Sequence, residues 1–234
     1  MISFEHVSKR YLRKQALSDV SITIPEGKII GLVGSNGSGK STFMKMIAGL
    51  VAPSEGTVMI DGEPVSRRTA HKVAYLSELD AYYSFYTVEE TIRFFSSQFA
   101  DFDTQKAYDI VKFMEVDLNQ KVKHLSKGNR GRVKIALTLA RDVPIILMDE
   151  PLSGLDPLVR DSIVKGLLSF IDMERQTILI TTHEVTEIES LLETVIAIRN
   201  GNVLAMEEVE TIRERDRIRV VEWMKRIYRN KEEV

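Results

Sequence analysis

The sequence predicts an α/β fold whose core is a parallel sheet. Three short apolar runs, at residues 28–33, 145–148 and 177–180, support this prediction. Runs of this length and composition are typical of buried parallel strands. Each run is followed by glycine or polar residues, and the ligands of such sheets bind beyond the carboxyl ends of the strands. We therefore expect the functional residues at the ends of these three strands.

The first run leads into a phosphate-binding loop. Residues 34–41 read G-S-N-G-S-G-K-S and match the pattern G-x-x-x-x-G-K-[ST] without a mismatch. Apolar residues at helical spacing then predict a helix, and a glycine-rich turn before a helix presents backbone N–H groups to an anion. Lys40 is expected on the β- and γ-phosphates and Ser41 on Mg²⁺. The predicted nucleoside triphosphate ligands are Gly34, Ser35, Asn36, Gly37, Ser38, Gly39, Lys40, Ser41 and Thr42.

The second run ends in two adjacent carboxylates, Asp149 and Glu150. Asp149 is predicted to hold Mg²⁺ through water. Glu150 is predicted to lie beside the γ-phosphate and to orient or deprotonate the attacking water. The alternative is a strand that ends in a solvated acidic turn, but the phosphate-binding loop earlier in the chain favours the catalytic interpretation.

A helix is predicted after Ser126, with Val133, Ala136, Leu137 and Ala140 on its apolar face. Ser126 is a favourable N-cap, and Gly128 allows a close approach of the backbone to whatever binds at this helix end. Two interpretations stay open from this segment alone. It is a second phosphate-binding helix terminus or an ordinary capped helix.

Composition sets further limits on the function. The chain has 234 residues, 44% of them hydrophobic, a formal net charge of −2 and no cysteine. This charge gives no reason to expect a nucleic-acid partner, because no large positive field is available. The absence of cysteine excludes disulfides and thiolate metal sites. No apolar stretch is long enough to cross a bilayer, so we expect a soluble protein whose membrane role, if it has one, depends on another chain.

Several motifs, in order, resemble those of the nucleotide-binding subunit of ATP-binding-cassette (ABC) transporters, from about Tyr11 to about Leu204. Residues 125–129, L-S-K-G-N, resemble the family's signature L-S-G-G-Q with two changes. Residues 149–151 with 153–157 are similar to its Walker B and D-loop sequences, and His183 stands where the family has its switch histidine. Tyr11 stands where the family places an aromatic ring against adenine.

The resemblance implies a P-loop NTPase fold with a RecA-like parallel-sheet core, an N-terminal antiparallel β-subdomain and an inserted helical subdomain. It implies ATP hydrolysis by two cassettes paired head to tail. Ser126 and Gly128 of one chain would contact the γ-phosphate held by Lys40 of the other, and Asp156 would lie on the two-fold interface. His183 would hold the γ-phosphate, Glu150 and the water in place.

Two departures from the family pattern concern charge. Glu78 occupies the position of the Q-loop glutamine, where it is assigned to catalysis and to Mg²⁺ together with Ser41 and Asp149; a carboxylate can still ligate Mg²⁺. We expect Glu78→Gln to retain ATP binding. The signature is changed at Lys127 and Asn129, and Lys127 is predicted to add positive charge near the partner's γ-phosphate.

Gly131 lies within the predicted signature helix, where a glycine costs about 1 kcal/mol of helix stability relative to alanine.

The chain is predicted to be a single ABC ATPase domain, residues 1–234. Residues 1–78 and 141–205 would form the β-subdomain and the nucleotide-binding core, with a hairpin turn at Asp61 and Gly62. Residues 79–140 would form the helical subdomain that carries the signature, and residues 206–234 a charged helical tail with one apolar face.

An aromatic cluster at residues 82–86 has two interpretations: a small local core, or an exposed surface that meets a partner. By analogy with the family, Tyr82, Tyr83 and Phe85 are predicted contacts of a transmembrane permease subunit. The predicted protein is the ATPase of an exporter similar to bacterial ABC-2-type systems. It would form a homodimer or a heterodimer and bind the inner face of the membrane through the permease. The alternatives are an ATPase that acts on nucleic acid or the ribosome, and a nucleotide-gated regulatory module.

Overall fold

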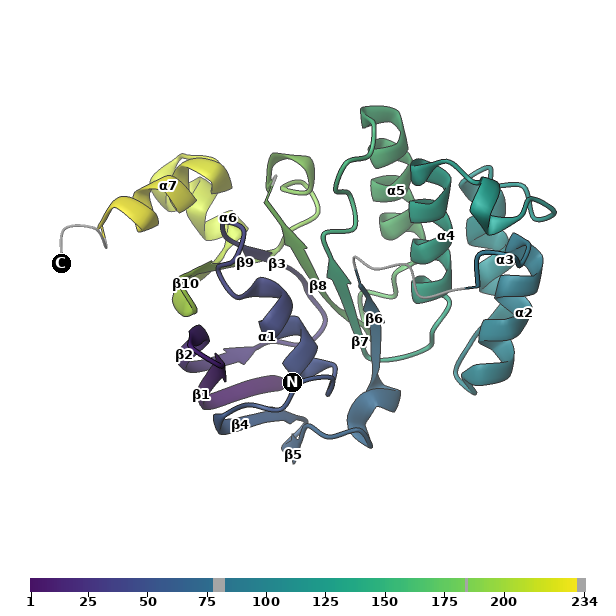
Figure 1. Cartoon of the computed structure of the whole chain (residues 1–234). Coiled ribbons are helices and arrows are strands. Elements are labelled where there is room, and N and C mark those ends of the chain that lie inside the picture. Colours follow the sequence, from purple (N-terminus) through teal and green to yellow (C-terminus); the bar gives the residue numbers. More distant parts are fainter. Residues whose placement is uncertain (78–82, 184, 231–234) are drawn as a thin grey trace.

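The computed structural model describes residues 1–77, 83–183 and 185–230. Two sheets form its framework (Figure 1). The larger has the order β10-β9-β3-β8-β7-β6, and the smaller has the order β2-β1-β4-β5. The strands of the larger sheet are β3 (Ile29–Val33), β6 (Val73–Leu76), β7 (Ile145–Asp149), β8 (Thr177–Thr182), β9 (Thr194–Arg199) and β10 (Asn202–Glu208). Those of the smaller are β1 (Ile2–Tyr11), β2 (Lys14–Ile24), β4 (Glu55–Ile60) and β5 (Glu63–Pro64).

The centre of the larger sheet is parallel, as the apolar runs predicted. β3 pairs with β8 and β9, and β7 pairs with β6 and β8, all in parallel. Every residue of β3, β7 and β8 is buried. The three predicted strands are therefore confirmed, and their carboxyl ends meet at one edge of the sheet. The phosphate-binding loop, Glu150 and His183 all follow at that edge.

Helix α1 (Lys40–Ile47) lies between the two sheets (Figure 1). Its apolar face carries Phe43, Met44, Met46 and Ile47, all buried. Phe43 stacks on Phe4 of β1 with ring centres 4.1 Å apart. One hydrophobic cluster joins side chains of both sheets and of α1. The smaller sheet thus fixes the helix that begins at Lys40.

Helices α2 (Val88–Gln98), α3 (Thr104–Phe113), α4 (Lys127–Leu139) and α5 (Pro157–Phe170) gather on the side of β6 and β7 (Figure 1). A capping box at Thr87 and Glu90 begins α2. The predicted N-cap of α4 is confirmed, because the Ser126 hydroxyl accepts a hydrogen bond from the Asn129 N–H at 3.1 Å. Buried side chains of α2, α3, α4 and α5 share one cluster with the larger sheet. Among the described residues, no helix is long and apolar enough to cross a membrane.

The last segment packs on the body of the protein through its apolar face. It contains α6 (Val209–Thr211), the short π-helical turn η4 (Ile212–Asp216) and α7 (Val220–Asn230), while β10 extends to Glu208. Val220 and Trp223 are buried. Buried Glu189 accepts hydrogen bonds from the Val220 N–H at 3.1 Å and from the Arg219 guanidinium at 3.1 Å. The start of α7 is therefore fixed to the segment that follows His183.

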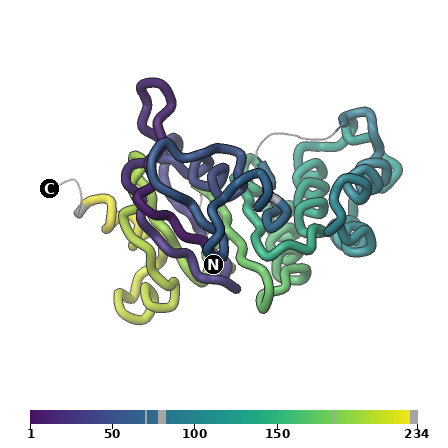
Figure 2. The backbone as a smooth tube through the Cα atoms, turned by 90° about the horizontal axis from the view of Figure 1, so that it is seen from below, coloured from purple at the N-terminus to yellow at the C-terminus, as the bar shows by residue number. Residues whose placement is uncertain are grey.

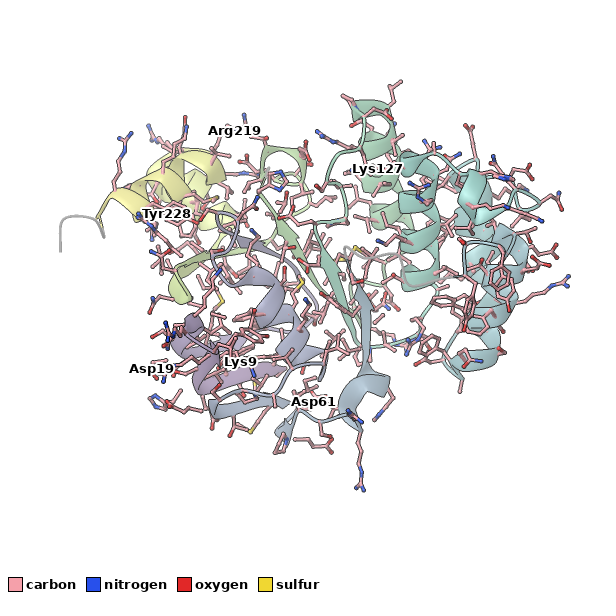
Figure 3. All side chains as sticks on the ribbon, in the orientation of Figure 1. Lys9, Asp19, Asp61, Lys127, Arg219 and Tyr228 are labelled. Carbon is pink, nitrogen blue, oxygen red and sulfur yellow. The ribbon has the colours of Figure 1, made fainter. Side chains whose placement is uncertain are left out.

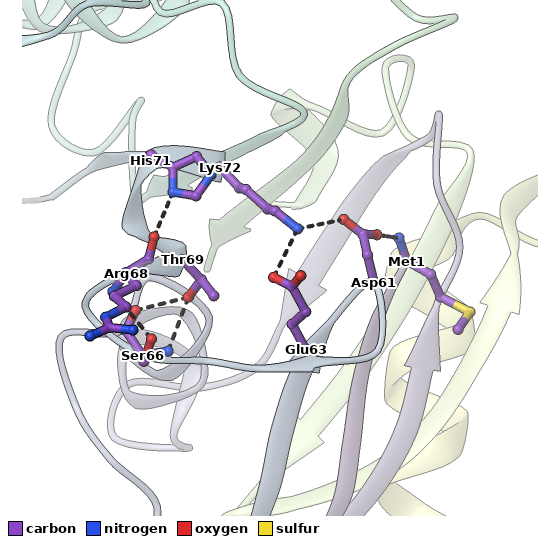
Figure 4. A network of polar contacts seen from close by, with 8 residues as sticks. All are labelled: Met1, Asp61, Glu63, Ser66, Arg68, Thr69, His71 and Lys72. Carbon is purple, nitrogen blue, oxygen red and sulfur yellow. Dashed lines mark hydrogen bonds and ion pairs between the residues drawn. The ribbon is translucent and has the colours of Figure 1, made fainter.

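Charged residues join the first strand to the β4–β5 turn (Figure 4). The Met1 amine donates to Asp61 Oδ1 at 2.6 Å, and Lys72 lies 3.4 Å from Asp61 Oδ2 and 3.3 Å from Glu63. The hydrogen bond from the Met1 amine is the main cause of a lowered pKa at Asp61. Asp61 and Gly62 have φ values of 54° and 77°, which a two-residue hairpin turn of type I′ requires. The predicted turn is confirmed.

Candidate active site

The phosphate-binding loop connects β3 to α1 in a conformation that favours glycine at two positions. Gly37 has a φ of 78° and Gly39 a φ of 114°. A Cβ at Gly39 would lie 2.5 Å from the Ala16 carbonyl oxygen, and one at Gly34 would overlap the Ile198 carbonyl oxygen. The loop is thus held closely against β2 and β9. The first N–H groups of α1 face it and remain available to an anion.

Lys40 holds its charge inside this loop. The residue is only 6% exposed, and its ammonium donates to the Gly34 carbonyl at 2.7 Å and to the Ser35 carbonyl at 3.3 Å. It also lies 3.6 Å from Glu150 Oε1. A buried ammonium needs such partners to offset the loss of hydration. The loop therefore positions a cation where phosphate oxygens are expected.

Three hydroxyl groups converge on buried Asp149. Ser41 and Thr181 donate to its Oδ1 at 3.1 and 2.8 Å, and Tyr75 donates to its Oδ2 at 3.1 Å. The Thr181 hydroxyl also accepts from the Glu150 N–H at 2.8 Å. The sequence analysis did not assign a role to Tyr75 or Thr181. The available signal was a hydroxyl residue near the carboxyl end of each strand beside β7.

Glu150 and His183 form a hydrogen-bonded pair at the ends of β7 and β8. Glu150 Oε2 lies 2.7 Å from His183 Nδ1. Glu150 has a φ of 50°, a left-handed conformation that is unfavourable for a residue with a Cβ. Its N–H is held by Thr181, and its carbonyl accepts from the Ser153 N–H at 3.2 Å. Residues with such a strained backbone conformation cluster at functional sites.

A cavity of about 380 Å³ gathers most of the predicted residues. Tyr11 lies in its wall, and Lys9 Nζ lies 5.1 Å from the centre of the Tyr11 ring while donating to the Ala52 carbonyl at 2.7 Å. Lys14, which the sequence analysis did not assign, also lines this cavity. The lining residues that the structure describes are Tyr11, Lys14, Ala16, Asn36, Gly37, Gly39, Lys40, Ser41, Thr42, Glu150, Ser153 and His183.

Ser126, Gly128 and Asp156 are absent from the described lining of this cavity. They lie instead at the N-termini of α4 and α5. Asp156 caps α5 by accepting from the Val159 N–H at 3.0 Å. A Cβ at Gly128 would lie 3.1 Å from the Val159 side chain, so the missing Cβ allows α4 to approach α5 closely. One chain therefore brings together the phosphate loop and the acid–histidine pair in this cavity, but not Ser126, Gly128 and Asp156. Lys127 of the signature lines a second cavity, together with Asp149 and Glu150.

The two changed signature positions have different surroundings. Lys127 lies at the start of α4 (Figure 3). Its ammonium occupies the space that a Cβ at Gly154 would take. Asn129 accepts a hydrogen bond from Arg132 at 3.2 Å through its side-chain oxygen. Glu78, at the position of the Q-loop glutamine, and Tyr82 lie outside the described residues.

Comparison with known proteins agrees with this geometry. The family model described as "ABC transporter" matches residues 17–153. Nod factor export ATP-binding protein I of Burkholderia lata is 35% identical over 213 residues, covering 87% of this chain and 69% of that protein. The ABC transporter ATP-binding protein NatA of Bacillus subtilis is 31% identical, with 93% of each chain covered.

Solved structures extend the agreement to three dimensions. The ATP-binding subunit of an ABC transporter has a TM-score of 0.80 and 26% identity, over 94% of this chain and 95% of that one. A dimeric ATP-binding cassette in a post-hydrolysis state, bound to ADP and Pi, has a TM-score of 0.79 and 26% identity, over 89% and 98%. Because the family model, the relatives and the solved cassettes all agree with the residues gathered at the sheet edge, this chain belongs to the ABC transporter family, as an ATP-binding subunit that hydrolyses ATP.

Proposed function

We propose that this subunit powers export through a separate permease. Support comes from its relatives: the Nod factor protein is named for export, and the match to NatA covers nearly the whole of both chains. The chain itself offers no membrane-crossing helix among its described residues, so the transport path would belong to another subunit. The subunit would then act on the cytoplasmic face of the membrane.

The catalytic unit would be a pair of cassettes with shared ATP sites. The observation that supports this most directly is the separation of Ser126, Gly128 and Asp156 from the cavity that holds Lys40, Glu150 and His183. Ser126 and Asp156 are exposed on the surface, where a second chain can reach them. Solved relatives of the same fold are dimeric. A γ-phosphate held by both chains would join them, and its hydrolysis would release them.

The geometry supports a part in hydrolysis for each of these side chains. Lys40 and the loop N–H groups hold the phosphates. Glu150 orients a water and accepts its proton, while His183, 2.7 Å away, fixes the carboxylate and faces the γ-phosphate. Attack of the water oxygen on the γ-phosphorus breaks the bond to the β,γ-bridging oxygen, and ADP and orthophosphate result.

Mg²⁺ fits the donor set at Asp149. This ion prefers oxygen ligands and keeps several waters, and the Ser41 hydroxyl lies 3.1 Å from the Asp149 carboxylate. Ser41 would ligate the ion directly and Asp149 through water, with Glu78 a further ligand from outside the described residues. Bound there, Mg²⁺ would neutralise charge on the phosphates.

Tyr83 and Phe85 are proposed permease contacts. Their side chains are 50% and 59% exposed, and their ring centres lie 5.5 Å apart. Tyr83 also meets Tyr86 and Phe94 edge to face. Both earlier interpretations of this segment thus have support, because the rings pack on one another and still offer apolar surface to a partner.

Dimer formation by Glu150→Gln tests the proposed function. This variant keeps the shape of the side chain but cannot accept the proton, so ATP should persist between two chains. Light scattering after size exclusion should show a dimer with ATP and Mg²⁺ and a monomer with ADP. The double variant Lys40→Met, Glu150→Gln is the matched control and should stay monomeric. A Glu150→Gln protein that remains monomeric at saturating ATP, alone and with its permease, would contradict the shared site.

A further inference from the structure

Lys14 begins β2 directly after the turn that joins it to β1. In the sheet register it lies opposite Tyr11, which precedes it across the two-residue turn formed by Leu12 and Arg13. Leu12 has a φ of 49° and is fully exposed, so the turn projects from the body, as the purple loop in Figure 2 shows. The turn therefore carries Tyr11 and Lys14 together on one side of the nucleotide cavity.

The Lys14 ammonium lies beside the phosphate-binding loop. It is the nearest group to Gly37, 3.8 Å from where a Cβ at that glycine would stand. Gly37 belongs to the loop whose backbone N–H groups face an anion. Ala16, two residues further along β2, is buried against the same loop through its carbonyl oxygen next to Gly39. The start of β2 is thus fixed against the loop, and Lys14 extends over it.

The other cations of this hairpin are engaged elsewhere or face away. Lys9 donates to the Ala52 carbonyl at 2.7 Å, and Arg10 lies 3.4 Å from the Gln15 side chain. Arg13 is exposed and is not among the described residues that line the cavity. Within the described part of the chain, no hydrogen bond or ion pair engages the Lys14 ammonium.

Charge in the cavity favours an anion at Lys14. Among the described lining residues Glu150 is the only acid, and it lies 3.6 Å from Lys40. Lys40 therefore belongs to the end of the cavity that holds Glu150 and His183. Lys14 belongs to the other end, between Tyr11 and Gly37.

We propose that Lys14 is a second phosphate-binding lysine, which contacts the nucleotide's α- and β-phosphates. Lys40 then serves the end where the γ-phosphate is cleaved, and Lys14 serves the part that ATP and ADP share. Lys14 increases the affinity for both nucleotides by the same factor and slows the release of ADP. It discriminates nucleoside di- and triphosphates from uncharged nucleosides without discriminating ATP from ADP.

Calorimetric titration of Lys14→Met tests this assignment. ADP and ATP are each titrated into the otherwise unchanged chain without Mg²⁺, so that ATP is not hydrolysed and the Mg²⁺-dependent dimer proposed above does not form. An exposed, charge-assisted contact should cost about five- to ten-fold in affinity, equally for ADP and ATP. Lys14→Arg should restore most of the loss. The dependence of affinity on salt should become weaker in Lys14→Met because one phosphate contact is gone.

Arg13→Met is the matched control. It removes the same charge from the adjacent residue, and its affinity for ADP should change less than two-fold. Equal losses of ADP affinity in Lys14→Met and Arg13→Met would show that Lys14 acts only through its general positive charge, and this would overturn the assignment. A loss confined to ATP would also overturn it, because Lys14 would then act on the γ-phosphate. Binding by single chains is measured, so the result does not depend on the proposed dimer.

Discussion

The two sides of the ATPase are built in different ways. On the phosphate-loop side, which comprises Lys40, Asp149, Glu150 and His183, the charged groups bond to one another or to nearby backbone and hydroxyl groups. On the signature side, which comprises Ser126, Gly128 and Asp156, the side-chain oxygens are exposed and only cap helices. Groups proposed to act on a nucleotide in their own chain are held in place by contacts within that chain. Groups proposed to act on a partner's nucleotide are kept accessible.

Physical chemistry explains the difference. Buried charges need partners to offset lost hydration, so the phosphate-loop side requires a dense network. A helix N-terminus presents N–H groups and a partial positive charge without any buried ion. Such a surface can stay exposed in a single chain and still bind phosphate in a pair. The two sides should therefore respond separately to substitution.

The largest effect is expected for His183→Ala. The substitution removes the group 2.7 Å from the Glu150 carboxylate, so turnover should fall at least about 100-fold. Binding of ATP by the single chain should change less than two-fold, since Lys40 and the loop remain. Steady-state hydrolysis and calorimetry measure the two quantities. A parallel loss of ATP affinity would show that the phosphate-binding loop and Lys40 are not positioned independently of the histidine.

An intermediate effect is expected at Ser126. Ser126→Ala removes the cap of α4, which should cost about 1 kcal/mol and lower Tm by about 2–4 °C. Ser126→Asp keeps the cap and should restore Tm, but it directs a negative charge at the partner's phosphate. Turnover should therefore fall at least about ten-fold below that of Ser126→Ala. Wild-type turnover in Ser126→Asp would leave Ser126 with the role of a cap alone.

The smallest effect is expected at Lys106 of α3, in the helical layer behind α4. Burial is the main cause of its lowered pKa, against the opposing attraction of Asp103, Asp142 and Asp172. Because its pKa in the folded protein lies below the ordinary lysine value of 10.5, the unfolded chain binds more protons between these two values. Stability therefore rises with pH in that window, and the full penalty is present at neutral pH.

Lys106→Met should raise Tm by about 1–2 °C at pH 7 and leave turnover unchanged. The gain should disappear as the pH approaches 10.5. Lys112→Met, at an exposed position of the same helix, is the control and should leave Tm unaltered. A change in turnover would mean that α3 affects hydrolysis and does not only support α4 by packing.

The sequence predicted the elements whose signals are local. The runs that became β3, β7 and β8, the Ser126 cap and the turn at Asp61 all depend on a few consecutive residues. The hydroxyl groups around Asp149 could not be found in this way. Thr181 reaches Asp149 because their strands pair in that register, and Tyr75 comes from the strand on the other side. The position of Lys14 likewise depends on how the β1–β2 hairpin folds over the loop.

The signature helix contains one residue without a structural requirement. A Cβ at Gly131 would meet Leu155 at 3.5 Å, an ordinary contact distance, so nothing in the described packing demands glycine there. Gly128 differs, since a Cβ would press against Val159 at 3.1 Å. The subdomain boundaries and the role of Glu78 stay predictions.

Glu189 has a practical consequence for experiments with shortened chains. Its carboxylate is buried and takes its hydrogen bonds from the beginning of α7. Truncation before residue 219 would leave this acid without those donors, six residues after His183, the predicted switch histidine. Loss of activity in such a minimal cassette would reflect damage to the catalytic loop itself, and it could not be taken as proof that a separate regulatory tail had been removed.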